Sequence, residues 1–171
     1  MIPNQINSSE DLEAVFYALN EDIYGYIMGR VRSQVVAEDI AQEVFVKAWE
    51  KRTQFNSEKG SLKNWIYGIA LNAVYDYFRR QKNRRTEELR EDFSDAKDIK
   101  SDTAIKLLHS QIMDQMQFLS QKDQDVLLLR YAQELSVEEI AEVMNMNYSA
   151  TKVALHRATK KLKERCNRFM P

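Results

Sequence analysis

Residues 137–164, VEEIAEVMNMNYSATKVALHRATKKLKE, contain two stretches of helical period separated by a short polar break. Ser136 stands just before the first stretch, and Glu139 follows it by three residues, which is the spacing of a capping box at the start of a helix. The apolar residues of this stretch recur on one side: Ile140, Ala141 and Met144. The pattern therefore predicts a short amphipathic helix.

The second stretch is longer and basic. Its inward stripe recurs at spacings of four, three and four residues: Thr151, Leu155, Ala158 and Leu162. The opposite side then faces solvent or a groove: Lys152, His156, Arg157 and Lys160. Ser149 can cap this helix, and a tight turn separates it from the first. The segment has the form of a helix-turn-helix, a DNA-binding motif, although a helical hairpin with a solvated basic face has the same spacing.

Helical periodicity covers most of the 171 residues. The predicted helices are about 11–32, 35–51, 62–82, 104–118, 121–131, 137–144 and 149–168. Only four Gly and two Pro break the chain, and no alternating β-branched run has turn signals on both sides. We therefore predict an all-α protein of two small domains, an N-terminal helical bundle at 8–85 and a C-terminal helix-turn-helix domain at 104–171. Residues 86–103 are too charged to bury a core and predict a flexible acidic linker.

The composition disfavours several classes of function. The lone Cys166 excludes an internal disulfide, and His109 and His156 are too far apart for a usual metal cluster. No nucleophile is paired with a base and no Gly-rich phosphate loop occurs, so we expect no enzyme, cofactor or small-molecule substrate. The first residues do not resemble a signal peptide, and no run of about 18 apolar residues is present. We expect a cytoplasmic protein without membrane insertion.

The charged residues are unevenly distributed, although the formal net charge is only −1. Residues 1–50 contain nine Asp or Glu and three Lys or Arg, whereas two later stretches are strongly basic. The first is Arg79, Arg80, Lys82, Arg84 and Arg85, and the second is Lys152, Arg157, Lys160, Lys161, Lys163, Arg165 and Arg168. Each stretch either binds phosphates or forms a solvated helix face.

The predicted helix at 35–51 combines an apolar and an acidic face. At about 100° per residue, its apolar face contains Ile40, Ala41, Val44, Phe45, Ala48 and Trp49. The opposite face contains Asp39, Gln42, Glu43 and Glu50, together with the apolar Val46. An apolar residue within an acidic surface is a feature of surfaces that bind a partner.

The predicted helix at 62–82 is apolar on two faces. One face contains Leu62, Ile66, Ile69, Ala73 and Tyr77, and the other contains Tyr67, Leu71, Tyr75 and Phe78. Such a helix is either sandwiched between two others, or its outward aromatic residues stack on unpaired bases while the basic residues that follow bind the backbone.

These segments, in this order, resemble those of the extracytoplasmic-function sigma factors, small members of the bacterial sigma-70 family. AEDIAQEVFVKAWE, at 37–50, resembles the helix that those proteins dock on the clamp of the polymerase largest subunit. FNSEKGSLKNWIYGIALNAVYDYFRR, at 55–80, resembles their segment that melts and recognises the −10 element. LSQKDQDVLLLRYAQELSVEEIAEVMNMNYSATKVALHRATKKLKE, at 119–164, resembles their −35-binding domain. The resemblance implies an alternative sigma factor that directs transcription initiation.

The resemblance also implies the site residues, position by position. Those expected to contact core polymerase are Asp39, Gln42 and Glu43, with Val46 beside them on the same face. Those expected at −10 DNA, including the loop 56–64 around a flipped base, are Asn56, Ser57, Lys59, Asn64, Asn72, Tyr75, Asp76, Arg79 and Arg80. Those expected at −35 DNA are Ser149, Lys152, Val153, His156, Arg157 and Lys160. The family commonly has Gly in the turn where this chain has Asn145, which can still adopt a left-handed conformation. Val153 and Ala154 stand where Ser and Arg are frequent in the family, which implies less direct base recognition and more use of phosphates and DNA shape.

The partners that the resemblance implies are RNA polymerase core, through its largest-subunit clamp and its flap, promoter DNA, and an anti-sigma factor. Two other hypotheses stay open. A stand-alone helix-turn-helix regulator would leave the N-terminal half unexplained and would normally bind paired half-sites as a dimer. An enzyme or ligand-binding helical domain would require a closed pocket.

Overall fold

The computed structural model describes residues 2–87 and 104–169. All regular structure in these ranges is helical, as predicted, and the chain divides into an N-terminal and a C-terminal unit. None of the helices among the described residues is long and apolar enough to cross a membrane. Of the segment 86–103, which is predicted to be a linker, residues 86 and 87 form the last two residues of a helix, and the rest lies outside the described residues.

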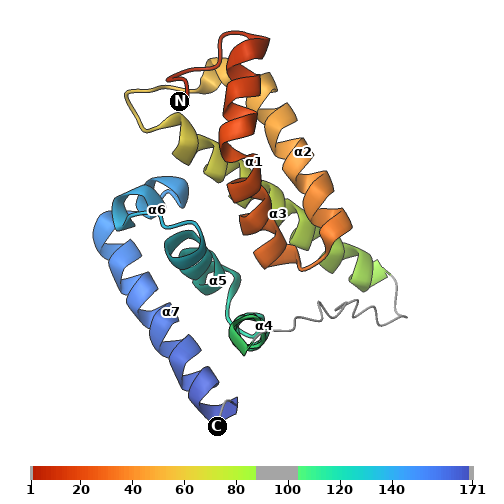
Figure 1. Cartoon of the computed structure of the whole chain (residues 1–171), viewed down its shortest axis with the longest axis vertical. Coiled ribbons are helices and arrows are strands. Elements are labelled where there is room, and N and C mark those ends of the chain that lie inside the picture. The colour runs from red at the N-terminus through yellow and green to blue at the C-terminus, as the bar shows by residue number, and fades with distance from the viewer. Residues whose placement is uncertain (1, 88–103, 170–171) are drawn as a thin grey trace. The chain divides into compact units, whose positions relative to one another are not determined.

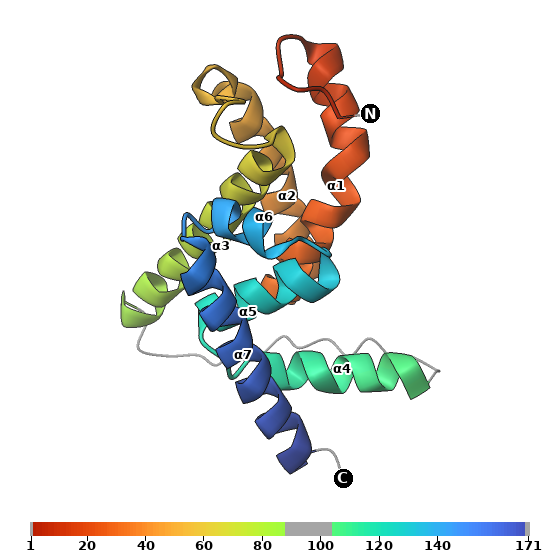
Figure 2. The ribbon, with the colours of Figure 1, turned by 90° about the vertical axis from the view of Figure 1, so that its left-hand side faces the viewer.

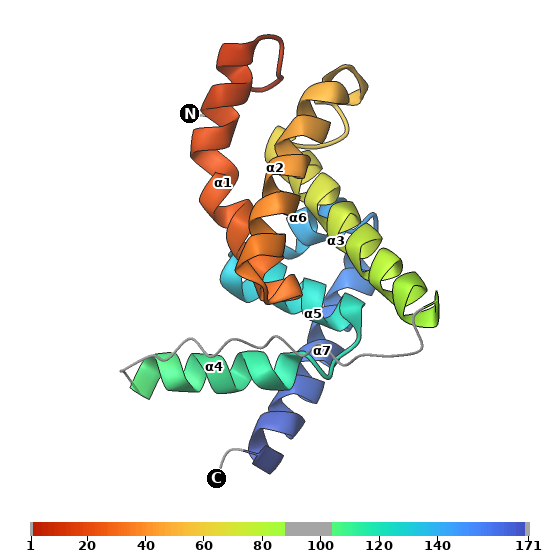
Figure 3. The ribbon, with the colours of Figure 1, turned by 90° about the vertical axis from the view of Figure 1, so that its right-hand side faces the viewer.

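Three helices form the N-terminal unit: α1 (Ser9–Val31), α2 (Gln34–Glu50) and α3 (Leu62–Glu87), with a short 3-10 helix, η1 (Arg52–Gln54), after α2. α1 and α2 lie side by side, and α3 packs against both (Figures 1 and 3). α1 starts at a capping box in which Ser8 Oγ accepts the Asp11 N–H at 3.2 Å and the Asp11 carboxylate accepts the Ser8 N–H at 3.1 Å. It ends at Val31, and the next residue, Arg32, has a left-handed φ of 56° that turns the chain toward α2.

The packing of α3 explains its two apolar faces. Tyr67 is fully buried, and its ring lies edge-on to Tyr26 of α1 with 6.3 Å between centroids. Phe78 is half-buried, and the Arg30 guanidinium lies 5.2 Å from the centre of its ring. Of the two alternatives left open by the sequence, burial between helices therefore holds for Tyr67, which lies in the core, whereas Tyr75 is half-buried.

The C-terminal unit comprises α4 (Ala104–Met116), α5 (Gln121–Leu127), the π-helical η2 (Leu128–Ala132), α6 (Val137–Val143) and α7 (Tyr148–Phe169). α5 and α4 both pack against α7, and Figure 2 shows α6 leading through a tight turn into α7. The core of the C-terminal unit contains Val126, Leu127, Leu129, Leu135, Ile140, Ala154 and Ala158. The sequence predicted one α-helix over 121–131, but the Gln133 N–H bonds to the Leu128 carbonyl at 3.0 Å, five residues back, so the last turn widens to a π-helix.

Candidate nucleic-acid and polymerase interfaces

The predicted helix-turn-helix is formed by α6 and α7. Its capping box is present, because the Glu139 N–H donates to Ser136 Oγ at 3.1 Å and the Ser136 N–H donates to Glu139 Oε2 at 2.7 Å. Asn145 has a φ of 51°, and the Met146 N–H donates to the Ala141 carbonyl at 2.8 Å. This is the six-to-one bond of a Schellman turn, in which Asn supplies the left-handed residue in place of Gly.

The predicted cap of α7 is wrong by two residues. The helix starts at Tyr148, and Asn147 caps it: Asn147 Oδ1 accepts the Ala150 N–H at 2.7 Å and its carbonyl accepts the Thr151 hydroxyl at 3.0 Å. Asn and Ser are comparable N-caps. Because Asn147 and Ser149 lie only two positions apart, the sequence alone does not show which of them caps the helix. Ser149 is instead an exposed residue of the first turn.

α7 exposes one polar and basic face. The exposed residues include all six positions predicted for −35 DNA: Ser149, Lys152, Val153, His156, Arg157 and Lys160. The opposite side packs into the unit, with Thr151, Ala154 and Ala158 buried and Leu155 and Leu162 half-buried. Ala154, which the sequence grouped with Val153 as a DNA-facing position, is only 4% exposed and belongs to the core.

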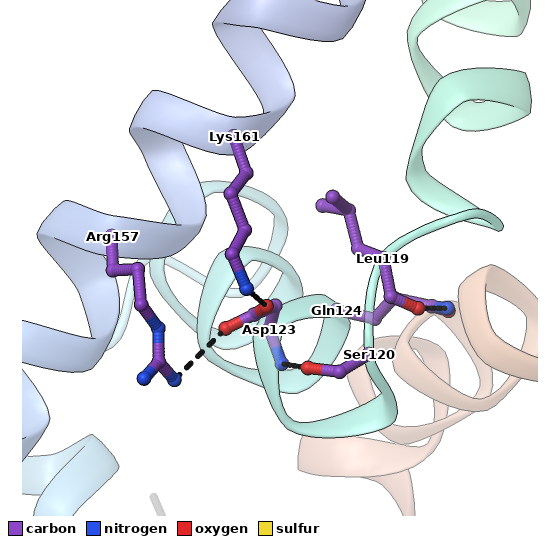
Figure 4. Close-up of polar contacts among 6 residues, drawn as sticks. All are labelled: Leu119, Ser120, Asp123, Gln124, Arg157 and Lys161. Atoms are coloured by element: carbon purple, nitrogen blue, oxygen red, sulfur yellow. Dashed lines mark hydrogen bonds and ion pairs between the residues drawn. The ribbon is translucent and has the colours of Figure 1, made fainter.

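A buried aspartate joins α5 to this basic helix, as Figure 4 shows. The Asp123 side chain is fully buried, and its carboxylate accepts hydrogen bonds from Lys161 Nζ at 2.7 Å and Arg157 Nη2 at 3.3 Å. Its backbone N–H donates to Ser120 Oγ, the cap of α5, at 3.2 Å. Burial raises the pKa of Asp123, but hydrogen bonds from Lys161, Ser120 and Arg157, together with the positive charge of Lys161, outweigh burial and hold the pKa below its ordinary value.

Arg157 therefore has a structural partner as well as an exposed surface, since its side chain is 54% exposed. The pairing was not predicted, because Asp123 and Lys161 lie 38 positions apart and no local pattern connects them.

α2 presents the predicted acidic face. Asp39 and Gln42 are exposed, and Val46 is 56% exposed although it is apolar. Glu43 Oε1 pairs with Lys47 Nζ at 2.6 Å on the next turn. The buried residues of the helix are Ala37, Ile40, Ala41, Val44, Phe45 and Ala48. The four residues predicted to contact core polymerase thus share one side of α2, opposite the side that packs.

Two exposed aromatic residues on α1 were not predicted. Phe16 packs edge-on against Phe45 of α2, with 5.0 Å between ring centroids, and Tyr17 beside it is 77% exposed. A sequence signal exists, because Val15 and Leu19 form the buried stripe of α1 and two aromatic residues between them must fall outside it.

The residues predicted for −10 DNA begin in the loop before α3. Its exposed members include Asn56, Ser57 and Lys59. Asn56 orders the loop locally, since its Oδ1 accepts the Glu58 N–H at 2.9 Å. Asn64 lies in the first turn of α3, where its N–H donates to Ser61 Oγ at 3.1 Å.

The other predicted −10 residues recur along one face of α3 at helical spacing. Asn72 and Arg80 are exposed, and Tyr75 is half-buried. Asp76 Oδ1 pairs with Arg79 Nη2 at 2.9 Å, less than one turn further on. The face therefore presents an amide and positive charge to solvent, with a half-buried tyrosine beside them, and these groups are suited to a base and its backbone.

Two family models match the chain, Sigma-70 region 2 over residues 16–84 and Sigma-70, region 4 over residues 109–162. The chain is 31% identical over 170 residues to the RNA polymerase sigma factor YlaC of Bacillus subtilis, and this match covers 92% of the chain and 91% of YlaC. It is 26% identical over 160 residues to the ECF RNA polymerase sigma factor SigM of the same organism, which covers 92% and 96%. The fold is similar to that of the sigma factor RpoE in its co-crystal structure with the anti-sigma factor NepR from Bartonella quintana. The TM-score is 0.73 and the sequence identity is 19%, and the match covers 92% of this chain and 98% of that chain.

The chain belongs to the sigma-70 family, in its extracytoplasmic-function group. As an alternative sigma factor, it directs transcription initiation by binding RNA polymerase core and promoter DNA. The N-terminal half matches region 2 of these proteins. The hypothesis of a stand-alone helix-turn-helix regulator gave this half no role.

Proposed function

We propose that three surfaces of this sigma factor divide the work of initiation. The acidic face of α2 binds the clamp of the polymerase largest subunit, the loop 56–64 and α3 melt and recognise the −10 element, and α7 binds the −35 duplex. Domain 8–85 carries the first two surfaces, domain 104–171 carries the third and contacts the flap, and residues 86–103 connect them. The supporting observation is that the residues assigned to α2 and α7 each share one solvent-facing side of their helix, opposite the packed side.

The chain contributes binding free energy and no chemical step. Extruding a base from a duplex costs a few kcal/mol, and hydrogen bonds from an exposed amide on α3 offset this cost while selecting the base. The polymerase is in the cytoplasm, so the chain acts there. RpoE forms a complex with the anti-sigma factor NepR. A corresponding anti-sigma factor would inhibit this chain by covering the same exposed surfaces.

Run-off transcription with purified core polymerase tests the proposal as a whole. We expect a transcript from a subset of promoter fragments only when the chain is added, and a shift of the chain into the polymerase fraction on gel filtration. Sequence-specific DNA binding by a dimer of the chain without core would contradict the proposal.

Asn72 is expected to recognise one base of the −10 element. Because Asn72 is exposed, Asn72→Ala should leave the melting temperature and core binding unchanged. The amide offers both a donor and an acceptor to a base edge, so its loss should cost about 1 to 3 kcal/mol of discrimination at one −10 position, by analogy with amide contacts in duplex grooves. The measurement is open-complex formation on promoters varied base by base.

The matched control is Asn83→Ala, at an exposed position further along α3, which should keep the wild-type preference profile. If Asn72→Ala also keeps that profile, or depresses all promoter variants equally, Asn72 does not recognise a base.

A further inference from the structure

Val153 is an apolar residue near the middle of the basic face of α7. It is 66% exposed, and at about 100° per residue Ser149, His156, Arg157 and Lys160 lie within roughly 60° of it. Neither packing nor helix formation accounts for this valine, because a side chain that is 66% exposed gains little from burial and Val is a poorer helix former than Ala or Lys.

The surroundings of Val153 fit duplex DNA better than an apolar protein surface. Exposed Lys152, Arg157 and Lys160 place positive charge around it, and this charge complements the phosphates of a duplex. In the major groove, the apolar group on the base edges is the C5-methyl group of thymine. An apolar side chain within a basic, DNA-binding face can therefore pack against the methyl group of a thymine.

The place of Val153 along α7 also fits contact with a base. It lies in the second turn of the helix, and recognition helices present their N-terminal residues to base edges. An α-helix with its side chains is about 10–12 Å across and the major groove is about 12 Å wide. A short side chain in the middle of the face thus reaches the bases, whereas long Lys and Arg side chains reach the phosphates at the rims. Valine is nearly fixed at χ1 in a helix, so the contact costs little rotamer entropy.

We propose that Val153 determines specificity at one position of the −35 element by contacting the 5-methyl group of a thymine. This inference rests on the proposed function of α7. It gives the helix direct base recognition by an apolar group, in addition to the phosphate contacts that its basic residues make.

Deoxyuridine substitution tests the contact, because uracil pairs as thymine does and lacks only the methyl group. On a promoter that the holoenzyme transcribes, each −35 thymine is replaced in turn, and the holoenzyme concentration for half-maximal open complex is measured. One replacement should weaken wild-type binding roughly three- to fivefold, the value for losing one buried methyl group. Val153→Ala holoenzyme should bind the thymine and uracil promoters equally.

Lys160→Ala is the matched control on the same face. It should weaken binding to both promoters equally and lower the salt dependence by roughly one counterion, while keeping the difference between thymine and uracil.

Two results would overturn the role of Val153 alone: a wild-type holoenzyme indifferent to every uracil, or a thymine preference that Val153→Ala retains. Absence of any transcription or sequence-specific binding would overturn the proposed function, and this inference with it.

Discussion

A Gln42→Arg, Glu43→Lys double variant is expected to bind core polymerase at least about a hundredfold more weakly than wild type. Both side chains lie on the outward side of α2 beside the exposed Val46, where the proposed clamp contact falls. A partner surface that complements the acidic face of α2 is positively charged, so the new Arg and Lys side chains would meet like charge. Like charges placed against each other across an interface cost several kcal/mol, and each 1.4 kcal/mol is a factor of ten in affinity. The free protein loses the Glu43 to Lys47 ion pair, which contributes about 0.3–0.5 kcal/mol on a helix surface, and gains a like-charge contact of similar size with Lys47. The change should therefore affect binding and leave the fold intact.

Co-purification with core polymerase, followed by titration of labelled protein, measures this loss, and circular dichroism of the free variant checks its folding. Gln5→Arg with Glu13→Lys introduces the same charges at exposed positions outside α2 and should bind core normally. Undiminished core binding by a folded Gln42→Arg, Glu43→Lys protein would show that the acidic side of α2 is not the contact.

Local patterns in the sequence predicted the helices and the turn of the helix-turn-helix. The capping box at Ser136 and the left-handed turn at Asn145 each depend on residues within a few positions of one another, so a single sequence contains the whole cause. The same holds for the acidic side of α2, where helical period alone separates Val46 from the buried residues.

Features that depend on distant residues were beyond such patterns. The two apolar faces of α3 were compatible with burial or with base stacking, and only contact with Tyr26 of α1 shows that Tyr67 is buried. The buried pairing of Asp123 with α7 is of this kind too, because a charged residue in the first turn of a helix ordinarily faces solvent and complements the helix dipole. The π-helical turn at Leu128–Ala132 likewise has no sequence mark, since its residues are ordinary helix formers.

Asp123→Asn is expected to lower the free energy of unfolding of the C-terminal unit by about 1 to 3 kcal/mol at neutral pH. Removing one partner of a fully buried ion pair costs about 3–5 kcal/mol. The cost here is smaller, because the Arg157 and Lys161 side chains are 54% and 46% exposed and can turn toward water when the carboxylate is lost. For a domain of this size, each kcal/mol corresponds to roughly 4–8 °C in melting temperature.

The position of the tryptophans separates this effect from general destabilisation. The chain has two Trp, and both Trp49 and Trp65 lie in the N-terminal unit. Urea unfolding followed by circular dichroism should therefore show a shifted transition in the variant, while unfolding followed by Trp fluorescence should not. Lys161→Met should behave like Asp123→Asn, whereas Lys163→Met, at an exposed position of the same helix, should unfold as wild type does.

The stability difference between wild type and Asp123→Asn should depend on pH, because the pKa of Asp123 is lowered in the folded chain. A carboxyl whose pKa is lower in the folded than in the unfolded chain stabilises the fold fully above its unfolded pKa, and this stabilisation is lost as the pH falls through the folded pKa. The wild-type and Asp123→Asn unfolding transitions should therefore lie furthest apart near neutral pH and converge in acid, below the ordinary pKa of an aspartate. A difference that is absent at pH 7, or that grows as the pH falls, would show that the carboxylate of Asp123 does not hold α5 to α7.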